Sequence, residues 1–315
     1  MILVTAKSAK SAKSCLNCLV FDYNKFRVSG CAISSVVSAI LVLGLIVAFT
    51  TTIHVSYIPA WKNDAERSHM DDTWSDMADL KSNIDILSAG MVTNPASNIQ
   101  VSVPVKMGGG DIPIVSTGKS SGTLSVNLND FDMAITAYNA SGVVYDSGSD
   151  LFDLGSISYS SKNNYYINQV FEYENGALLV VQDSRSLVKL LPAVTVSKLG
   201  ATDISVVVSA VELVGNKRTK SSNTIEVVYL KSNTSGVLYS NSDLVSDVNI
   251  SVSTNYPNAW AQYFNTTADR ANLQYGTDYT ITTTDTSTAF ALTGGASEDI
   301  RLSVQKITLD VWIDA

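Results

Sequence analysis

The 34 residues from 28 to 61, between Arg27 and Lys62, contain no Asp, Glu, Lys or Arg. The centre of this run, CAISSVVSAILVLGLIVAFTTTIHVSYI, is longer and more apolar than a buried helix of a globular domain needs. About 20 such residues cross the hydrocarbon layer of a bilayer as a helix. The run therefore predicts one transmembrane helix over residues 31–58, with membrane lipid as a partner.

Charge is distributed unevenly on the two sides of this run. Residues 1–30 hold five basic residues and one acid, so 16 of the 21 basic residues and 28 of the 29 acids follow the run. Positive charge next to a spanning helix favours the cytoplasmic side. We therefore expect a basic cytoplasmic leader over residues 1–30 and an acidic extracellular part at the cell surface. Nucleic acid is not expected as a partner, because its binders need a basic face.

A helical pattern continues after Pro59, a residue that removes one backbone bond and predicts a bend. Apolar positions alternate at spacings of three and four over residues 59–90, which is the heptad pattern. They are Met70, Thr73, Met77, Leu80, Ile84 and Leu87. Gly90 marks the expected end of this stalk helix. Two alternatives stay open: the stripe packs against other copies of itself, or it lies on the chain's own β domain.

From Ser97 onward the pattern has a period of two, which is typical of strands. About a dozen expected strands, NYYINQV among them, are separated by turn clusters such as GGGD, NASG and YENG. One helix begins at Pro257, and its apolar face holds Trp260, Phe264, Ala268 and Ala271. The fold class is therefore α+β, a long N-terminal transmembrane and stalk helix followed by an extracellular antiparallel β-sandwich over residues 91–315. A soft boundary near residue 200, where the strand pattern restarts, is an alternative to one undivided domain.

Histidine and cysteine are confined to the N-terminal part of the chain. The only histidines are His54 and His69, and the only cysteines are Cys15, Cys18 and Cys31. Residues 70–315 therefore lack the groups for Ser-His-Asp or Cys-His catalysis, for zinc hydrolysis and for haem ligation. We expect no enzyme and no cofactor, and assign no catalytic, cofactor-binding or metal residues.

The carboxylates leave a weaker alternative open. Asp146, Asp150 and Asp153 are close in sequence, and such a group binds calcium or serves as acid and base in other proteins. These residues do not fit a complete calcium-loop pattern, so solvated turn acids are the main interpretation. A surface hydrolase that uses Asp150 and Asp153 is the remaining enzymatic hypothesis.

Four N-x-S/T tripeptides lie in the expected extracellular part. Their acceptor residues are Asn139, Asn233, Asn249 and Asn265. Each tripeptide alone is a weak signal, because such triplets arise by chance in chains rich in Asn and Ser. Their number on the expected outer side predicts that some of them carry a glycan.

The stretch from Arg27 to Leu45, with AISSVVSAILVLGL after a glycine, resembles the N-terminal segment of archaeal type IV pilins and pilin-like envelope proteins, whose leader is a class III signal peptide. The continuation NDAERSHMDDTWSDMADLKSNID resembles the polar stalk helix of a pilin-like branch of that group. The runs MGGGDIPIVSTGKSSGTLSV and LGSISYSSKNNYYINQVFEYENGALLVVQD, with Pro192, resemble the β domain of that branch. The resemblance covers about residues 27 to 195.

This resemblance implies that a membrane aspartyl prepilin peptidase removes the leader, with a cut near Gly30 and Cys31. It also implies that copies of the chain associate through the N-terminal helix to form a filament. Small side chains permit close helix approach in an apolar setting, and we expect this role of Ser34, Ser35, Ser38, Ala39 and Gly44. Ser35 stands where the group commonly carries a Glu or a Pro; in pilins a Glu there pairs with a neighbour's N-terminal amine, and that pairing is not available with Ser35.

Two functional hypotheses result. In the first, the chain is a pilin-like cell-surface protein with a structural or adhesive role, and a filament subunit. In the second, it is a single-pass envelope protein whose β domain binds polysaccharide or protein without forming filaments. The loop with Asn163, Asn164, Tyr165 and Tyr166 is the candidate sugar contact, because tyrosines stack on sugars.

Overall fold

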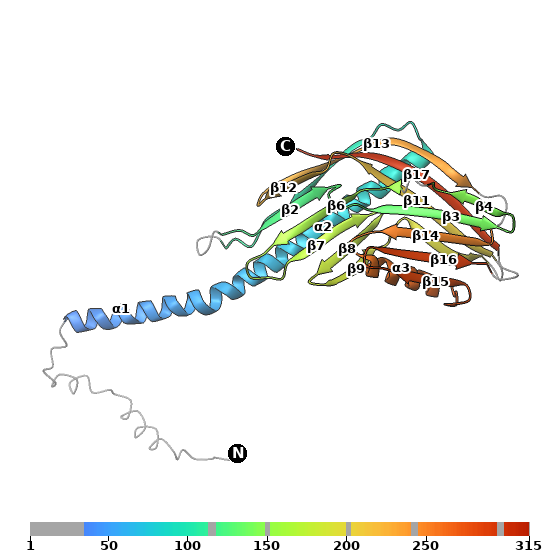
Figure 1. Cartoon of the computed structure of the whole chain (residues 1–315). Coiled ribbons are helices and arrows are strands. Elements are labelled where there is room, and N and C mark those ends of the chain that lie inside the picture. The colour runs from blue at the N-terminus through green and yellow to red at the C-terminus, as the bar shows by residue number, and fades with distance from the viewer. Residues whose placement is uncertain are drawn as a thin grey trace, which may run out of the picture. The chain divides into compact units, whose positions relative to one another are not determined.

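The computed structural model describes residues 35–112, 118–148, 152–199, 203–240, 245–294 and 299–314. The chain divides into two compact units, residues 1–55 and 56–315. The first unit contains one described α-helix, and the second contains the other two described α-helices and all the described strands (Figure 1). Each unit is described by itself below.

In the first unit, helix α1 spans Ser35–Thr52 and carries no charged side chain. Every side chain described from Val36 to Thr52 is exposed. The hydroxyl groups of Thr50 and Thr52 donate to the backbone carbonyls of Ile46 and Ala48, both at 2.9 Å. The helix therefore satisfies its own polar groups and leaves an apolar surface on all sides, which is what a lipid environment requires.

A short π-helical segment, η3 (Ile53–Tyr57), follows α1 and precedes Pro59. Proline lacks the N–H that an α-helix would use at this place, and one-turn π segments insert an extra residue where the regular ladder is interrupted. The sequence predicted a bend at Pro59 and a spanning helix over 31–58. In the described part of this range α1, η3 and α2 follow one another in an unbroken helical assignment, and the spanning segment 31–58 stays a prediction.

Helix α2 spans Ile58–Thr93 and is the longest helix of the second unit. Its buried positions include all six residues of the stripe expected from the sequence, namely Met70, Thr73, Met77, Leu80, Ile84 and Leu87. These side chains pack on strands of the same chain, so the structure shows the second of the two alternatives for the stripe. The expected stop at Gly90 is wrong, because the helix continues to Thr93 and the N–H of Asn94 donates to the Gly90 carbonyl at 2.8 Å.

The strands of the second unit form three sheets among the described residues. One has the order β1 (Gln100–Lys106), β13 (Ile225–Ser240), β17 (Asp299–Ile313), β11 (Asp203–Val214) and β10 (Val194–Leu199). A second has the order β12 (Arg218–Ser222), β2 (Ser121–Val126), β6 (Ser156–Lys162), β7 (Gln169–Glu174), β8 (Ala177–Gln182) and β9 (Arg185–Leu190). The third has the order β15 (Tyr279–Thr283), β16 (Ser287–Thr293), β14 (Asp247–Ser253), β3 (Asp132–Asn139) and β4 (Gly142–Asp146), with β5 (Phe152–Asp153) also on β3.

The sheets are antiparallel except for one pair, β11 and β17, which run parallel over the full length of β11, from Asp203 paired with Asp299 to Val214 paired with Asp310. The fold class expected from the sequence, α+β with a long N-terminal helix and a mostly antiparallel β domain, is thus confirmed. Strands from the two sides of residue 200 pair with each other, since β1 pairs with β13, β2 with β12 and β3 with β14. The sheets therefore cross the soft boundary considered near residue 200, and α2 belongs to the same unit as the strands.

Two hydrophobic cores fill this unit. One lies beneath α2 and includes Met77, Leu80 and Phe171. The other lies beneath helix α3 (Pro257–Arg270) and includes Trp260 and Phe264, both fully buried. The four apolar positions expected on α3, at residues 260, 264, 268 and 271, are all buried, which confirms that face. Figure 1 shows α2 and α3 lying against different parts of the strand array.

Strands β11 and β17 take part in both cores because they change their buried face partway along. In β17 the buried side chains are Ile300, Leu302 and Val304, and then Ile307, Leu309, Val311 and Ile313. In β11 they are Ile204, Val206, Val208 and Ala210, and then Val211 and Leu213. Successive strand residues point to opposite faces, so the change from even to odd numbers moves the buried side to the face that α2 covers.

Several strand predictions failed for physical reasons. Residues 164–168, expected in the strand NYYINQV, form a loop, and β7 begins only at Gln169. Strand β6 was not predicted, because its serines hide the apolar alternation of Ile157 and Tyr159. Strands β9, β12 and β16 were also missed, since their polar or small residues resemble loops.

Candidate functional site

The surface of α1 is the first candidate site, because no other described segment covers it. Among the small residues expected to pack against partner helices, Ser38, Ala39 and Gly44 lie on α1 and are exposed. A Cβ atom added at Gly44 would meet nothing within 4 Å. Ser34 and the side chain of Ser35 lie outside the described residues, as do Gly30 and Cys31 of the expected cleavage site. The packing and cleavage predictions therefore stay predictions.

Two aromatic side chains mark the start of the second unit. Tyr57 is 53 % exposed and Trp61 is 45 % exposed. Their ring centroids lie 5.9 Å apart, one helical turn from each other. Exposed Tyr and Trp concentrate at the depth of lipid headgroups, where the ring is in an apolar layer and the polar atom is hydrated. Their place at the C-terminal end of the charge-free run fits such an interface.

The first turns of α2 bury charged groups, which is unusual for a helix surface. Lys62 is 3 % exposed, and its Nζ donates to the backbone carbonyl of Gly110 at 2.7 Å and to that of Gly118. Glu66 is 1 % exposed and accepts from the backbone N–H groups of residues 164, 165 and 166 at 3.1, 2.7 and 2.8 Å. A carboxylate that accepts three backbone donors fixes the loop that carries them.

His69 lies one turn further along the same face of α2. Burial, the largest effect, lowers the pKa of its imidazole, so the neutral form is favoured. Its Nε2 lies 3.4 Å from the hydroxyl of Tyr159, which donates to the Met107 carbonyl at 3.1 Å. We call Lys62, Glu66 and His69 the α2 clamp, because together they contact the backbone at residues 107–110 and 118 and the loop at residues 163–168.

The glycines at 108–110, expected as a turn, have a specific reason to be glycine. A Cβ atom at Gly109 would lie 2.5 Å from Cγ of His69, and one at Gly110 would lie 2.5 Å from Cγ of Glu66. Gly110 also has a φ of +78°, which side chains disfavour. The backbone therefore approaches α2 directly, and the α2 clamp is a structural contact between helix and loops.

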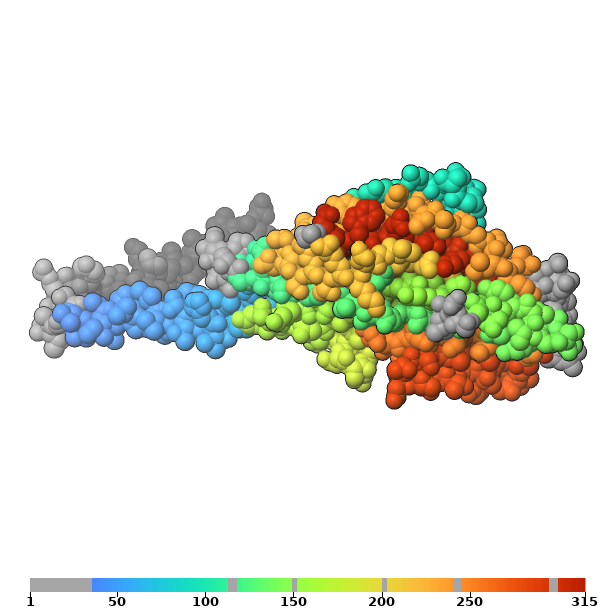
Figure 2. Space-filling model, turned by 45° about the horizontal axis from the view of Figure 1, so that its top comes forward, coloured from blue at the N-terminus to red at the C-terminus, as the bar shows by residue number. Residues whose placement is uncertain are grey.

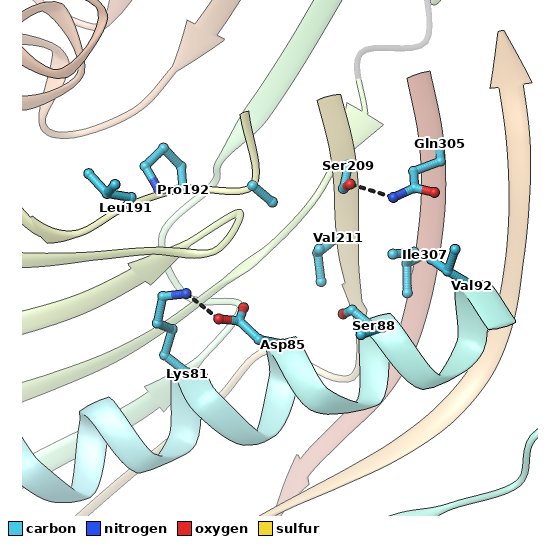
Figure 3. A pocket seen from close by; sticks show the side chains of 12 residues that line it. Lys81, Asp85, Ser88, Val92, Leu191, Pro192, Ser209, Val211, Gln305 and Ile307 are labelled. Atoms are coloured by element: carbon cyan, nitrogen blue, oxygen red, sulfur yellow. Dashed lines mark hydrogen bonds and ion pairs between the residues drawn. The ribbon is translucent and has the colours of Figure 1, made fainter. Parts of the chain in front are cut away.

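A cavity of about 300 Å³ opens between the C-terminal half of α2 and the two parallel strands (Figure 3). Val211 and Ile307 form its floor, and Ser88 points toward them from the helix. The Ser88 hydroxyl is buried and has no hydrogen-bond partner among the described residues. Beside it, Gln305 donates to the Ser209 hydroxyl at 2.6 Å. The cavity lies where the two strands change their buried face.

A buried pair of carboxylates was not predicted from the sequence. Glu172 and Glu174 lie on one face of β7 and are 0 % and 1 % exposed. Asn129 donates to both oxygens of Glu172 at 2.8 and 3.0 Å. Glu174 accepts from the Thr254 hydroxyl and from Nε1 of Trp260, both at 2.7 Å.

The environment of this pair favours the protonated form. Burial, with the neighbouring Glu172 as the second cause, raises the pKa of Glu174 to about 8. Burial also raises the pKa of Glu172. Both groups are closed to solvent, so a substrate has no access and the pair is part of the core. The sequence signal was present in the alternation FEYE, which places Glu on the face opposite to Phe171 and Tyr173.

The acidic residues considered for calcium or catalysis are dispersed. Asp146 ends β4 and its carboxylate accepts from the Gly148 N–H at 3.1 Å. Asp153 lies in β5 opposite Asp132, and Asp150 lies outside the described residues. Within the described ranges, no group of three or more His, Cys, Asp or Glu side chains is placed to hold a metal ion. The calcium and hydrolase hypotheses receive no support from these positions.

The four candidate glycan acceptors lie in different settings. Asn139 ends β3 at the β3–β4 turn, whereas Asn233 lies within β13, Asn249 within β14 and Asn265 within α3. The candidate sugar loop is held from inside by Glu66, and it exposes Tyr165 by 48 % while Tyr166 packs against the core beneath α2. The sequence predicted that the glycan acceptors and the sugar loop are at the surface. It did not predict which acceptors lie in regular structure, or that Tyr165 is exposed while Tyr166 is packed.

One family model matches the chain, over residues 31–311, and it is described as a family of unknown function, DUF7289. The match begins at the apolar run and includes both described units. No curated protein and no solved structure matches the chain. The residues themselves must therefore carry any functional argument.

Proposed function

Because the chain belongs to DUF7289, a family of unknown function, we propose its role from its own residues. It is a membrane-anchored, pilin-like cell-surface protein: α1 lies in the bilayer, and the second unit performs a structural or adhesive task outside the cell. The observation that carries this proposal is α1, a helix of 18 residues without charge whose described side chains are all exposed. Such a surface is stable in lipid and unstable in water.

The charge distribution supports the orientation. Five basic residues precede α1 and an excess of twelve acids follows it. The positive side of a spanning helix stays in the cytoplasm, which leaves the second unit outside. The exposed Tyr57 and Trp61 fit the outer interface of such a helix.

The structural or adhesive role is supported by the chemistry of the second unit. Common hydrolases pair a histidine with a serine or cysteine nucleophile. The one histidine of this unit, His69, is buried in the α2 clamp, and no Cys follows residue 31. The buried carboxylates Glu172 and Glu174 hold the core together through Asn129, Thr254 and Trp260.

Topology labelling tests this proposal. The chain has no cysteine after residue 31, so Thr277→Cys introduces a single exposed thiol in the second unit. An impermeant thiol reagent added to intact cells should label this variant, and the unaltered chain, whose three cysteines all precede α1, should stay unlabelled in intact cells. Labelling of Thr277→Cys only after lysis would contradict the proposed orientation. N-terminal sequencing of the mature chain then tests cleavage near residue 31, and electron microscopy of the same cells tests filament formation.

A second function is favoured by the loop at residues 163–168. The α2 clamp holds this loop rigid, and Tyr165 and Ile167 are 48 % and 45 % exposed on it. A rigid exposed tyrosine suits the stacking of a sugar ring or a partner protein. Polysaccharide binding by the intact chain in lipid nanodiscs, reduced at least tenfold by Tyr165→Ala and unchanged by Tyr275→Ala, would support this role. No binding to any arrayed glycan would remove the polysaccharide version.

A further inference from the structure

The four N-x-S/T tripeptides differ in whether the folded chain can present them to a modifying enzyme. An oligosaccharide is transferred to the amide nitrogen of Asn, and the hydroxyl two residues later is part of the recognised motif. Both groups must therefore reach the enzyme at the same time. A tripeptide within a paired strand or a helix must first unfold locally to do so, whereas a turn at the surface need not.

Asn139 meets these conditions. It is half-buried as the last residue of β3, where it closes the hairpin opposite Gly142, and residues 140–143 of the turn and of early β4 are exposed. Its Oδ1 accepts from the Ser141 N–H at 2.8 Å, which closes a small turn and leaves the amide nitrogen pointing away from that bond. Among the described residues, neither Nδ2 of Asn139 nor the Ser141 hydroxyl is engaged in a hydrogen bond. The β3–β4 hairpin lies at the surface of the second unit, coloured green in Figure 2.

Asn233 and its partner hydroxyl are both engaged. Nδ2 of Asn233 donates to Oδ1 of Asp310 at 2.8 Å. The Ser235 hydroxyl donates to the Met91 carbonyl at 2.8 Å. Asn233 is an exposed bulge residue of β13, and the next two residues, Thr234 and Ser235, pair with β17. Transfer to Asn233 would therefore require the Asp310 and Met91 hydrogen bonds, and the pairing of Thr234 and Ser235, to break.

The other two acceptors lie in regular structure as well. Asn249 is in the middle of β14, which is paired on both sides, with β16 and with β3. Asn265 lies in α3, where Nδ2 donates to Asp269 at 3.3 Å and Oδ1 accepts from the Tyr279 hydroxyl at 2.8 Å. At both positions the backbone that a transferase must bind is already hydrogen-bonded in a strand or a helix.

We propose that Asn139 is the glycan acceptor of the folded protein, and that the other three tripeptides stay unmodified. The donor is a lipid-linked oligosaccharide used by a separate transferase. A bond forms between Nδ2 of Asn139 and the anomeric carbon of the first sugar, while the bond from that carbon to the lipid phosphate oxygen breaks. The phosphate leaves with the lipid, and the amide nitrogen gives up one proton. This inference rests on the extracellular placement of the second unit proposed above.

Position 141 provides a matched pair of variants for the test. Ser141→Ala removes the hydroxyl of the motif but keeps the backbone N–H that bonds to Asn139, whereas Ser141→Thr keeps both. The full-length chain is purified from its own cells, and its peptides are analysed by mass spectrometry before and after removal of N-linked glycans. We expect the unaltered chain and Ser141→Thr to carry a glycan on the peptide that contains Asn139, and Ser141→Ala to carry none.

The outcomes separate this inference from the proposed function. If the thiol at position 277 is labelled from outside and the Asn139 peptide is unmodified, the inference is wrong while the placement stands. If that thiol is labelled only from inside, the placement fails and the inference with it. A glycan on Asn233, Asn249 or Asn265 of the native chain in place of Asn139 would also overturn the inference, because it would mean that folding does not select the site.

Discussion

Helices α1 and α2 follow each other in the chain but solve the problem of apolar surface in opposite ways. In α1 the apolar side chains surround the helix, and all those described are exposed. In α2 they form one stripe that is buried on strands of the same unit, while acids occupy much of the rest of the helix. The distribution of apolar residues around a helix, more than its helicity, therefore indicates whether lipid or protein covers it.

Charge in the middle of α1 should produce the largest effect. A lysine at the centre of a spanning helix costs about 2.5–3.5 kcal/mol, so Leu43→Lys with Val47→Lys should cost roughly 6 kcal/mol of membrane insertion. We expect the double variant to leave the membrane pellet for the soluble or degraded fraction. Ile86→Lys with Ile225→Lys, at two exposed positions of the second unit, is the control and should stay in the pellet. Equal behaviour of the two pairs would contradict the difference between the helices.

Truncation in the stripe of α2 should affect the folding of the second unit instead. Leu80 is fully buried, and Leu→Ala in such a place costs about 2–5 kcal/mol. For a unit of this size that corresponds to a melting temperature lower by roughly 5–15 °C. Ile86→Ala, on the exposed side of the same helix, should change it by about 1–2 °C at most. Thermal unfolding of the full chain in detergent measures both, and a small effect of Leu80→Ala would mean that α2 is not part of the core.

A change of pH should alter the stability of the second unit and not that of α1, because α1 has no titratable side chain. The pKa of Glu174 is 4.5 in the unfolded chain and about 8 in the fold. Between these values the unfolded chain loses a proton that the folded chain keeps, so stability falls as the pH rises from 4.5 to 8. The expected loss is a few kcal/mol, or on the order of 10 °C.

The variant Glu174→Gln isolates this contribution, since Gln is neutral at every pH, its amide oxygen can accept from Trp260, and its NH2 group can donate to the Thr254 hydroxyl. Its melting temperature should fall less than that of the unaltered chain between pH 5 and pH 8. Measuring the difference between the two chains at each pH removes the opposite contribution of His69, whose pKa is lowered. Parallel curves for the two chains would show that Glu174 ionises normally in the fold.

The smallest effect is expected at the α2 clamp, where helix and loop meet. Glu66→Ala removes the acceptor of three backbone N–H groups, and each unsatisfied donor that gains access to water costs little. We expect the free energy of local opening of this loop to fall by about 1–3 kcal/mol, which would be measured as roughly 5- to 100-fold faster amide exchange at residues 164–166. Asp64→Ala, at an exposed position of the same helix, should leave those rates unchanged. Unchanged rates in Glu66→Ala would show that the loop keeps its conformation without the carboxylate.

The sequence predicted what depends on periodicity along the chain. The sequence predicted the stripe of α2, the face of α3 and the apolar run of α1, because in each of them residues on one side of the helix meet the same surroundings at a regular spacing. It did not predict β6, whose serines are buried among apolar neighbours, nor the loop at 164–168, whose conformation depends on Glu66 about 100 residues earlier.

The candidate sites show the same limit. The sequence identified four glycan acceptors by their local motif, but only pairing partners such as Asp310 for Asn233 distinguish them. It likewise gave no indication that Glu172 and Glu174 share a closed environment, because that depends on Asn129 and Trp260 from distant elements. Contacts between distant segments are not encoded in any local pattern.

Amide exchange of the full chain in lipid vesicles, followed at increasing urea, tests the central claim most directly. We predict that α1 stays protected by lipid while α2 and the strands of the second unit lose protection together. Loss of protection in α1 at the same urea concentration as in α2, or a lack of protection in α1 from the start, would contradict it.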